Sequence, residues 1–165
     1  MSQLQIRPAT PDDASAIATI FNSYIALAYY TLEQIDWTEH SVAASIDVQD
    51  PRELFLVAEL ASEIKAWASI KKYSDRHGYR ATCVTSLFVS QNAKGQGIGG
   101  QLIEQLYEAC RQLGYHHLCA KIIARNQDSI NFHRRFGYEL VGIQKQAGLI
   151  NDEWVDVALM QKILD

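Results

Sequence analysis

The chain has 165 residues, which is the usual size of one domain, and 48% of them are hydrophobic, which is enough to build a full core. A net charge of -4, from 15 basic and 19 acidic residues, argues against a broad nucleic-acid-binding surface, because such a surface needs clustered Lys and Arg. The sequence has neither a signal peptide nor a run of 18 apolar residues. We therefore expect residues 1–165 to form one domain of a cytoplasmic protein, with neither nucleic acid nor a membrane as a partner.

The cysteines of the chain are Cys83, Cys110 and Cys119. Their number is odd and no CxxC pair is present, so neither a disulfide framework nor a zinc site is expected. We expect three buried thiols in a reducing compartment, and no bound metal.

The first elements in chain order are a short strand and a helix. Leu4–Arg7 is expected to be the strand. Thr10 can cap the helix, Pro11 suits its first turn, and apolar residues then recur at helical spacing as far as Ile25.

A second helix is expected after Thr38, which can serve as its N-cap. Val42, Ile46 and Val48 would lie on its inner side, and Pro51 would end it.

The rest of the chain predicts antiparallel strands, then a β-α-β unit, then a closing hairpin. The expected strands are Leu54–Leu60, Ile64–Tyr73 after a turn at 61–63, Thr82–Val89, His117–Ile123, Tyr138–Gln146 and Trp154–Lys162. The expected helices are Ile98–Leu113 and Asp128–Phe136. The order β-α-α-β-β-β-α-β-α-β-β predicts an α/β fold with a mixed sheet and helices on both faces.

The most informative segment is a loop with four glycines in six residues, where the strand ending at Val89 leads into the helix that starts at Ile98. Glycine lets the backbone approach a ligand closely, and a helix N-terminus adds unpaired N–H donors. We therefore expect a phosphate or pyrophosphate site here, although a flexible turn before a helix is the simpler alternative.

Two other phosphate loops compete with this interpretation. A P-loop is excluded because no Gly-Lys-[Ser/Thr] follows the glycines. Gly95, Gly97 and Gly100 match the dinucleotide pattern G-x-G-x-x-G, but residues 90–94 separate the loop from its strand, and no acidic residue ends the next strand. A nucleotide-binding redox protein is therefore disfavoured.

Two motifs resemble the signatures of the GNAT superfamily of N-acetyltransferases. Lys94-x-x-Gly97-x-Gly99 resembles its [Gln/Arg]-x-x-Gly-x-[Gly/Ala] loop, with Lys94 in place of the usual residue. Residues 126–138 resemble its Asn-x-x-[Ala/Ser]-x-x-x-Tyr-x-x-x-Gly-Phe stretch, with His133 in place of the tyrosine. The resemblance implies a GNAT-like, mostly antiparallel sheet and acetyl-CoA as co-substrate. It implies that acetyl-CoA is held by Leu87, Phe88, Val89, Lys94, Gly95, Gln96, Gly97, Ile98, Gly99, Gly100, Asn126, Ser129 and His133.

Three further segments are similar to phosphinothricin acetyltransferase-type enzymes. They are Tyr30-Thr31-Leu32-Glu33, Arg76-x-x-Tyr79-Arg80-x-Thr82 and Gly148-x5-Trp154-x-Asp156-Val157. Such enzymes acetylate the α-amine of phosphinothricin, methionine sulfoximine or methionine sulfone, and are usually homodimers. The resemblance implies substrate contacts from Tyr30, Thr31, Glu33, Arg76, Tyr79 and Arg80, and the arginines suit an anionic substrate group. A solvated polar loop is the alternative for the arginine segment.

Direct transfer in a ternary complex needs a proton acceptor for the amine and a way for the CoA thiolate to leave. The resemblance makes His133 the proton donor to the thiolate, the alternative being a histidine that packs on the sheet. The glutamate base of phosphinothricin-type enzymes is replaced here by Val84, which cannot accept a proton. A water held by Thr85 or Ser86, or Glu33 itself, is expected to replace it, unless the natural substrate differs.

Two other functions stay open at this point. One is acetylation of a different amine, such as a polyamine, an aminoglycoside or a protein N-terminus. The other is a non-catalytic acyl-CoA-binding module, which Val84 favours.

Overall fold

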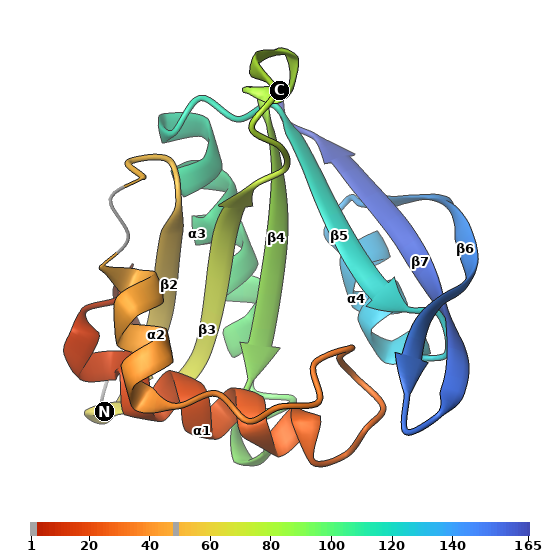
Figure 1. The fold of residues 1–165 in the computed structure, drawn as a ribbon. Coiled ribbons are helices and arrows are strands. Elements are labelled where there is room, and N and C mark those ends of the chain that lie inside the picture. The colour runs from red at the N-terminus through yellow and green to blue at the C-terminus, as the bar shows by residue number, and fades with distance from the viewer. Residues whose placement is uncertain (1–2, 48–49) are drawn as a thin grey trace.

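The computed structural model describes residues 3–47 and 50–165 (Figure 1). Its strands form one sheet in the spatial order β1-β2-β3-β4-β5-β7-β6. The strands are β1 Gln5–Pro8, β2 Leu54–Leu60, β3 Glu63–Lys72, β4 Thr82–Val89, β5 His117–Ile123, β6 Glu139–Ile150 and β7 Glu153–Ile163. The helices are α1 Ala14–Ile25, α2 Glu39–Ile46, α3 Ile98–Gln112 and α4 Gln127–Arg135.

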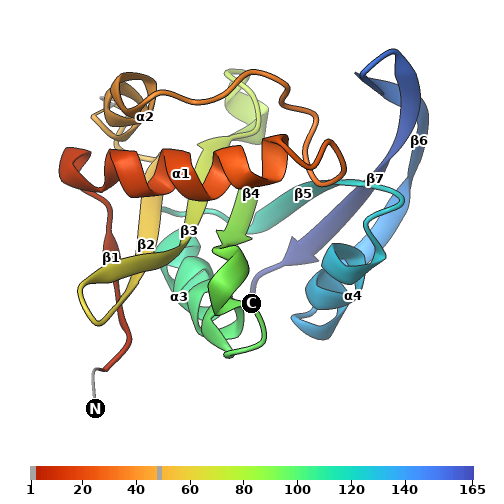
Figure 2. The same cartoon turned by 90° about the horizontal axis from the view of Figure 1, so that it is seen from below.

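The predicted fold class is confirmed. The order of strands and α-helices is the expected one, and every neighbouring pair of strands is antiparallel except β4 and β5. Figure 2 shows α1 and α2 on one face of the sheet and α3 and α4 on the other.

The N-terminal helices differ from the prediction at their ends. A 3-10 turn, Pro11–Asp13, precedes α1, and the Asp13 carboxylate accepts hydrogen bonds from the Thr10 N–H and the Arg7 guanidinium. The expectation that Pro51 ends the second helix is wrong, because α2 already ends at Ile46, where Asp47 leaves helical geometry with ψ near 12°.

The inner face predicted for α2 is confirmed in part. Val42 is buried and Ile46 is half-buried, and both contribute to the core beside α1. Val48, which was expected on the same face, lies outside the described residues.

Two hairpins differ from the sequence pattern. The turn between β2 and β3 has two residues, Ala61 and Ser62, both with positive φ, so β3 begins at Glu63. It ends at Lys72, one residue before the expected end at Tyr73. β6 continues past the expected end at Gln146 as far as Ile150, because a register irregularity between Gln144 and Gly148 interrupts its alternation. The left-handed pair 151–152 closes that hairpin.

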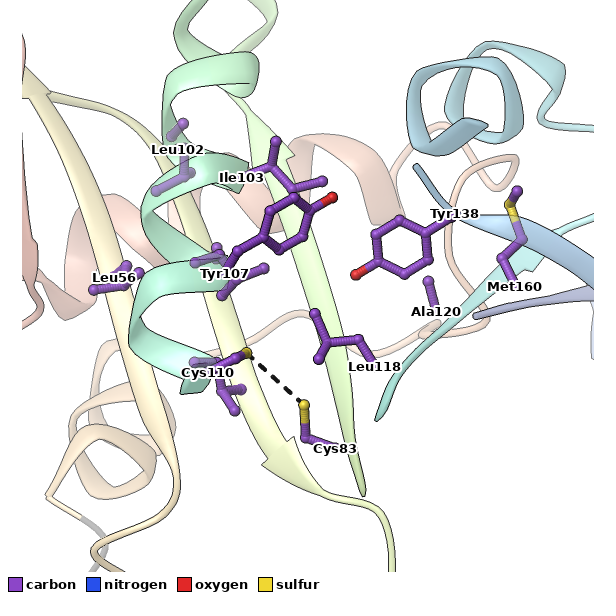
Figure 3. Packing of buried hydrophobic residues seen from close by; sticks show 14 of the residues in the cluster. Leu56, Cys83, Leu102, Ile103, Tyr107, Cys110, Leu118, Ala120, Tyr138 and Met160 are labelled. Atoms are coloured by element: carbon purple, nitrogen blue, oxygen red, sulfur yellow. Dashed lines mark hydrogen bonds between the residues drawn. The ribbon is translucent and has the colours of Figure 1, made fainter. Parts of the chain in front are cut away.

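The sheet separates two main clusters of buried side chains. Against α1, an aromatic cluster includes Phe21, Trp67 and Phe88. Against α3, Figure 3 shows Cys110 beside Cys83, with their Sγ atoms 3.9 Å apart, and Leu118 and Tyr138 in the same cluster.

The prediction for the cysteines is confirmed for two of the three. Cys83 and Cys110 are buried, whereas Cys119 is only half-buried, so the expectation was wrong for this residue. Its partner in the sheet register, Val84, is also half-buried. Both follow residues that point toward α3, so their side chains lie on the opposite face of the sheet.

β4 and β5 pair only at their first residues. The register runs from Thr82 opposite His117 to Val84 opposite Cys119 and then stops, and the strands diverge (Figure 1). β3, on the other side of β4, stays paired as far as Val89. In the part of the chain that the structure describes, no strand therefore pairs with the β5-facing edge of β4 beyond Val84.

Candidate active site

A cavity of about 550 Å³ lies where β4 and β5 diverge. Its walls come from the second half of β4, the glycine loop, β5 and α4, together with Tyr24 and Tyr30 from the other face. All residues expected to hold acetyl-CoA line this cavity except Gln96, whose side-chain amide turns back to donate to the Asn92 carbonyl at 3.2 Å. The structure thus brings together two motifs that lie about 30 positions apart in the sequence.

The glycine loop places the start of α3 at the cavity wall. Gly95 and Gly97 have φ of 76° and 78°, a left-handed conformation that favours glycine. A Cβ on Gly100 would lie 2.9 Å from the Phe136 ring, so α3 and α4 approach closely here. The first N–H groups of α3, from Ile98 to Gly100, precede the first intrahelical bond and can bind an anion.

Lys94 connects the glycine loop to α1. Its Nζ lies 5.0 Å from the ring centroid of Tyr24 and 5.2 Å from that of Tyr30, as in cation–π contacts. The Tyr24 hydroxyl donates to the Val89 carbonyl at the end of β4, and burial raises the pKa of Tyr24 to about 12, so this hydroxyl stays a donor. A positive charge is thereby held at the wall of the cavity.

His133 is buried in α4 and faces the cavity. Its Nδ1 lies 2.8 Å from the Ser129 carbonyl, so Nδ1–H donates there and Nε2 is the nitrogen that can change its protonation. Burial lowers the pKa of His133. Asn126 accepts from the Ser129 N–H and caps this helix. His133 can therefore donate from Nε2 only when it carries the extra proton.

The two hydroxyls expected to hold a water lie on opposite faces of β4. Thr85 is buried, with Oγ1 2.9 Å from the Tyr138 hydroxyl and 3.4 Å from the Cys119 carbonyl, so its hydroxyl is already engaged where the strands diverge. Ser86 is half-buried, lines the cavity, and shares the face of Phe88. Of the two, Ser86 has the side chain that is available to a ligand.

The residues expected to bind the substrate are only partly gathered at the cavity. Tyr30 lines it, whereas Thr31 and Glu33 do not, and Glu33 Oε1 accepts the N–H groups of the two residues that follow it. Arg76, Tyr79 and Arg80 lie in the exposed loop before β4, at the opposite end of that strand from the glycine loop (Figure 1).

Within one chain, this loop therefore does not reach the cavity. The substrate role of its residues stays a prediction.

Several cavity residues were missed by the sequence analysis. Lys121 and Arg135 add positive charge to its walls, and Phe132 and Phe136 add apolar surface. A lysine inside an otherwise apolar strand is a signal that could have identified Lys121. Together with Lys94, the basic residues suit a ligand with several phosphates.

Across residues 3–47 and 50–165, no group of His, Cys, Asp or Glu side chains could hold a metal ion. The helices of that part of the chain are too short or too polar to cross a membrane.

Known proteins resemble this chain along nearly its whole length. A family model described as acetyltransferase (GNAT) domain matches residues 6–159. An L-methionine sulfoximine/L-methionine sulfone acetyltransferase from Pseudomonas paraeruginosa is 29% identical, over 97% of this chain and 94% of its own length.

Two crystal structures share the fold. A GNAT superfamily phosphinothricin acetyltransferase from Sinorhizobium meliloti, in complex with AcCoA, has a TM-score of 0.89 and 28% identity, covering 98% of this chain and 88% of its own. A ribosomal-protein-alanine N-acetyltransferase from Brucella melitensis has a TM-score of 0.90 and 32% identity, covering 97% and 99%. The relatives thus differ in the acceptor that their names give.

Replacing Gly97 with Ala is expected to weaken acetyl-CoA binding by at least tenfold, or about 1.4 kcal/mol. An alanine there disfavours the left-handed φ of 78° that presents the loop N–H groups to the cavity. Titration calorimetry measures the change. Gly114→Ala is the matched control, because Gly114 has the same φ of 78° at the other end of α3, outside the cavity. Equal losses of affinity in both variants would contradict a role for the glycine loop in binding.

Proposed function

The chain belongs to the GNAT family of acetyltransferases and uses acetyl-CoA, and we propose that it acetylates the α-amine of a small amino-acid-like molecule. The proposed acceptors are of the methionine sulfoximine, methionine sulfone or phosphinothricin type, and the transfer is direct, in a ternary complex. The observation that carries the proposal is the cavity between the diverging strands, with the glycine loop at its edge. The similarity to a methionine sulfoximine/sulfone acetyltransferase supports the class of acceptor.

The donor side of the proposal rests on the unpaired edge of β4. Backbone N–H and C=O groups there need partners, and the extended amide chain of the pantetheine arm can supply them as an added strand would. The N-terminus of α3 then suits the pyrophosphate, with Lys94, Lys121 and Arg135 nearby. We propose that these groups orient the thioester in the gap.

On the acceptor side, positioning supplies much of the rate in a direct transfer. We propose that a β4 backbone N–H near Phe88 donates a hydrogen bond to the thioester carbonyl oxygen and so polarises the carbonyl. His133 is proposed to protonate the leaving thiolate from Nε2. Because its neutral form carries no proton there, the proton must reach Nε2 through the cavity in each turnover.

A second candidate acceptor is the N-terminus of a protein. The 32% identity to a ribosomal-protein-alanine N-acetyltransferase favours it. In either case the proposed substrate-binding groups are Glu33 and the arginines of the loop before β4, because a carboxylate suits an ammonium group and guanidinium groups suit a carboxylate.

We also propose a cytoplasmic homodimer in which residues 1–165 form a single catalytic domain. Exposed apolar side chains on the edge strand β6, at Leu140, Val141 and Ile143, support a second copy, since an edge strand of this kind favours association. A solution mass of one 18.6 kDa chain would contradict the dimer.

The amine panel is the direct test of the proposed function. The purified protein is incubated with acetyl-CoA and one amine at a time, and thiol release is followed. The panel contains methionine sulfoximine, methionine sulfone, phosphinothricin, a polyamine, an aminoglycoside and a peptide that begins with alanine. Fast release is expected with the first three. Release only with the peptide would move the assignment to a protein acceptor, and release with none would refute both.

Replacing His133 with Gln is expected to lower kcat by roughly 100-fold at pH 6 and by much less at pH 8. The pKa of His133 is lowered, so its donor form is populated at acidic pH and is lost as the pH rises through that pKa. Steady-state kinetics with the best acceptor of the panel compares the kcat of the variant with that of the wild type at both pH values. An equal loss at the two pH values would mean that His133 only packs against the sheet.

A further inference from the structure

Four side chains form a continuous line of hydrogen bonds across β5, β7 and β6, outside the cavity. Cys119 Sγ lies 3.5 Å from His117 Nδ1, and His117 Nε2 lies 3.2 Å from Gln161 Oε1. The Gln161 amide in turn donates to Glu139 Oε1 at 2.7 Å.

The end of this line at Glu139 determines the direction of every bond. A carboxylate only accepts, so the Gln161 NH2 group points to Glu139 and Oε1 points to His117. His117 then donates from Nε2, which leaves Nδ1 with its lone pair toward the Cys119 thiol. The line therefore presents a proton acceptor, His117 Nδ1, behind a thiol.

The thiol borders the point where the strands diverge. Cys119 is opposite Val84 in the last register pair of β4 and β5, and the next residues, Ala120 and Lys121, line the cavity. Cys83 and Leu118, one residue earlier on each strand, are buried against α3. Cys119 and Val84 therefore share the opposite face of the sheet, where no helix of the described residues covers β5 (Figure 2), and both are half-buried.

In the proposed reaction the attacking amine needs a proton acceptor, and Val84, at the position of the usual glutamate base, lies on this face beside Cys119. The glycine loop and α4 occupy the other side of the gap, which is the proposed donor side. On the face that Cys119 and Val84 share, Val84 cannot accept a proton and Ser86 is a weak base. Glu33 Oε1 already accepts two N–H groups of its own loop. An imidazole is the side chain whose basicity suits proton transfer near neutral pH.

We propose that Cys119 and His117 together form the proton acceptor for the acceptor amine, with Gln161 and Glu139 as positioning residues. The inference rests on the proposed function, because it assigns a step of that reaction. As the amine nitrogen bonds to the thioester carbon, its proton passes to Cys119 Sγ while the thiol proton passes to His117 Nδ1. The C–S bond then breaks, with the electron pair on the CoA sulfur, and His133 protonates this thiolate from Nε2. Solvent carries the proton from His117 to His133, so that both histidines return to their starting state.

The surroundings of Cys119 favour this relay over a nucleophilic role. Burial raises the pKa of Cys119, although the Lys121 charge opposes this, so the thiol is protonated and can donate to His117. Charged groups from the neighbouring strands also face this surface: Lys71, opposite Val84 on β3 and paired with Glu53, and Glu139 on β6.

A set of variants tests the relay by activity. His117→Gln is expected to lower kcat/KM by roughly 100-fold at pH 7.5 while leaving acetyl-CoA affinity unchanged. His116→Gln is the matched control, because His116 is exposed just before β5, and its activity is expected to match the wild type. Adding Val84→Glu to His117→Gln is expected to recover at least tenfold, since it supplies a carboxylate opposite Cys119. A structural role for His117 would give no such rescue.

The ring ¹⁵N shifts of His117 test the same inference without any substrate. The Nε2–H tautomer is expected at neutral pH, and Cys119→Val is expected to shift the Nδ1 resonance. An Nδ1–H tautomer, or activity of His117→Gln within twofold of the wild type, would overturn the relay. Since turnover by the wild type is measured separately, failure of the relay can be told apart from failure of the proposed function.

Discussion

The early end of pairing between β4 and β5 is the constraint on which the rest of the site depends. Three register pairs join the strands, and Thr85 then uses its hydroxyl to bridge the Tyr138 hydroxyl and the Cys119 carbonyl at the point of divergence. Beyond that point, β4 stays paired with β3 but no longer pairs with β5, so one edge of a central strand is unpaired among the described residues. An unpaired backbone edge lined by a cavity is a site for an extended polar chain, because buried backbone groups must find partners.

Charge and protonation divide the gap into two sides. On the side of α3 and α4, the helix N-terminus and Arg135 provide positive potential, and His133 presents one nitrogen. On the opposite face, the surface near Val84 carries the thiol of Cys119 and the imidazole of His117. The roles proposed for the two histidines have opposite requirements, since His133 would carry a proton on Nε2 to act and His117 would have Nδ1 free of one. In the proposed reaction, the acetyl donor and the amine meet from different faces of one sheet.

Much of the acetyl-CoA side of the cavity could be predicted from the sequence, because its features depend on residues that are adjacent in the chain. Glycines that need positive φ, such as Gly97, and a helix start beside them are read from neighbouring residues. The extension of β6 from Gln146 to Ile150 could not be predicted, because the irregularity near Gly148 breaks the alternation on which a strand prediction depends. The relay could not either, because Cys119 and Gln161 become neighbours only through the register of β5 with β7.

Hydrogen–deuterium exchange with and without acetyl-CoA tests most directly whether the ligand completes the free edge of β4. We expect acetyl-CoA to slow exchange at residues 86–89 and in the first turn of α3, with no change in β2, which lies away from the cavity. Slower exchange only at the first turn of α3 would mean that the ligand is held by its phosphates alone. That result would contradict a role for the gap between β4 and β5 in binding the pantetheine arm.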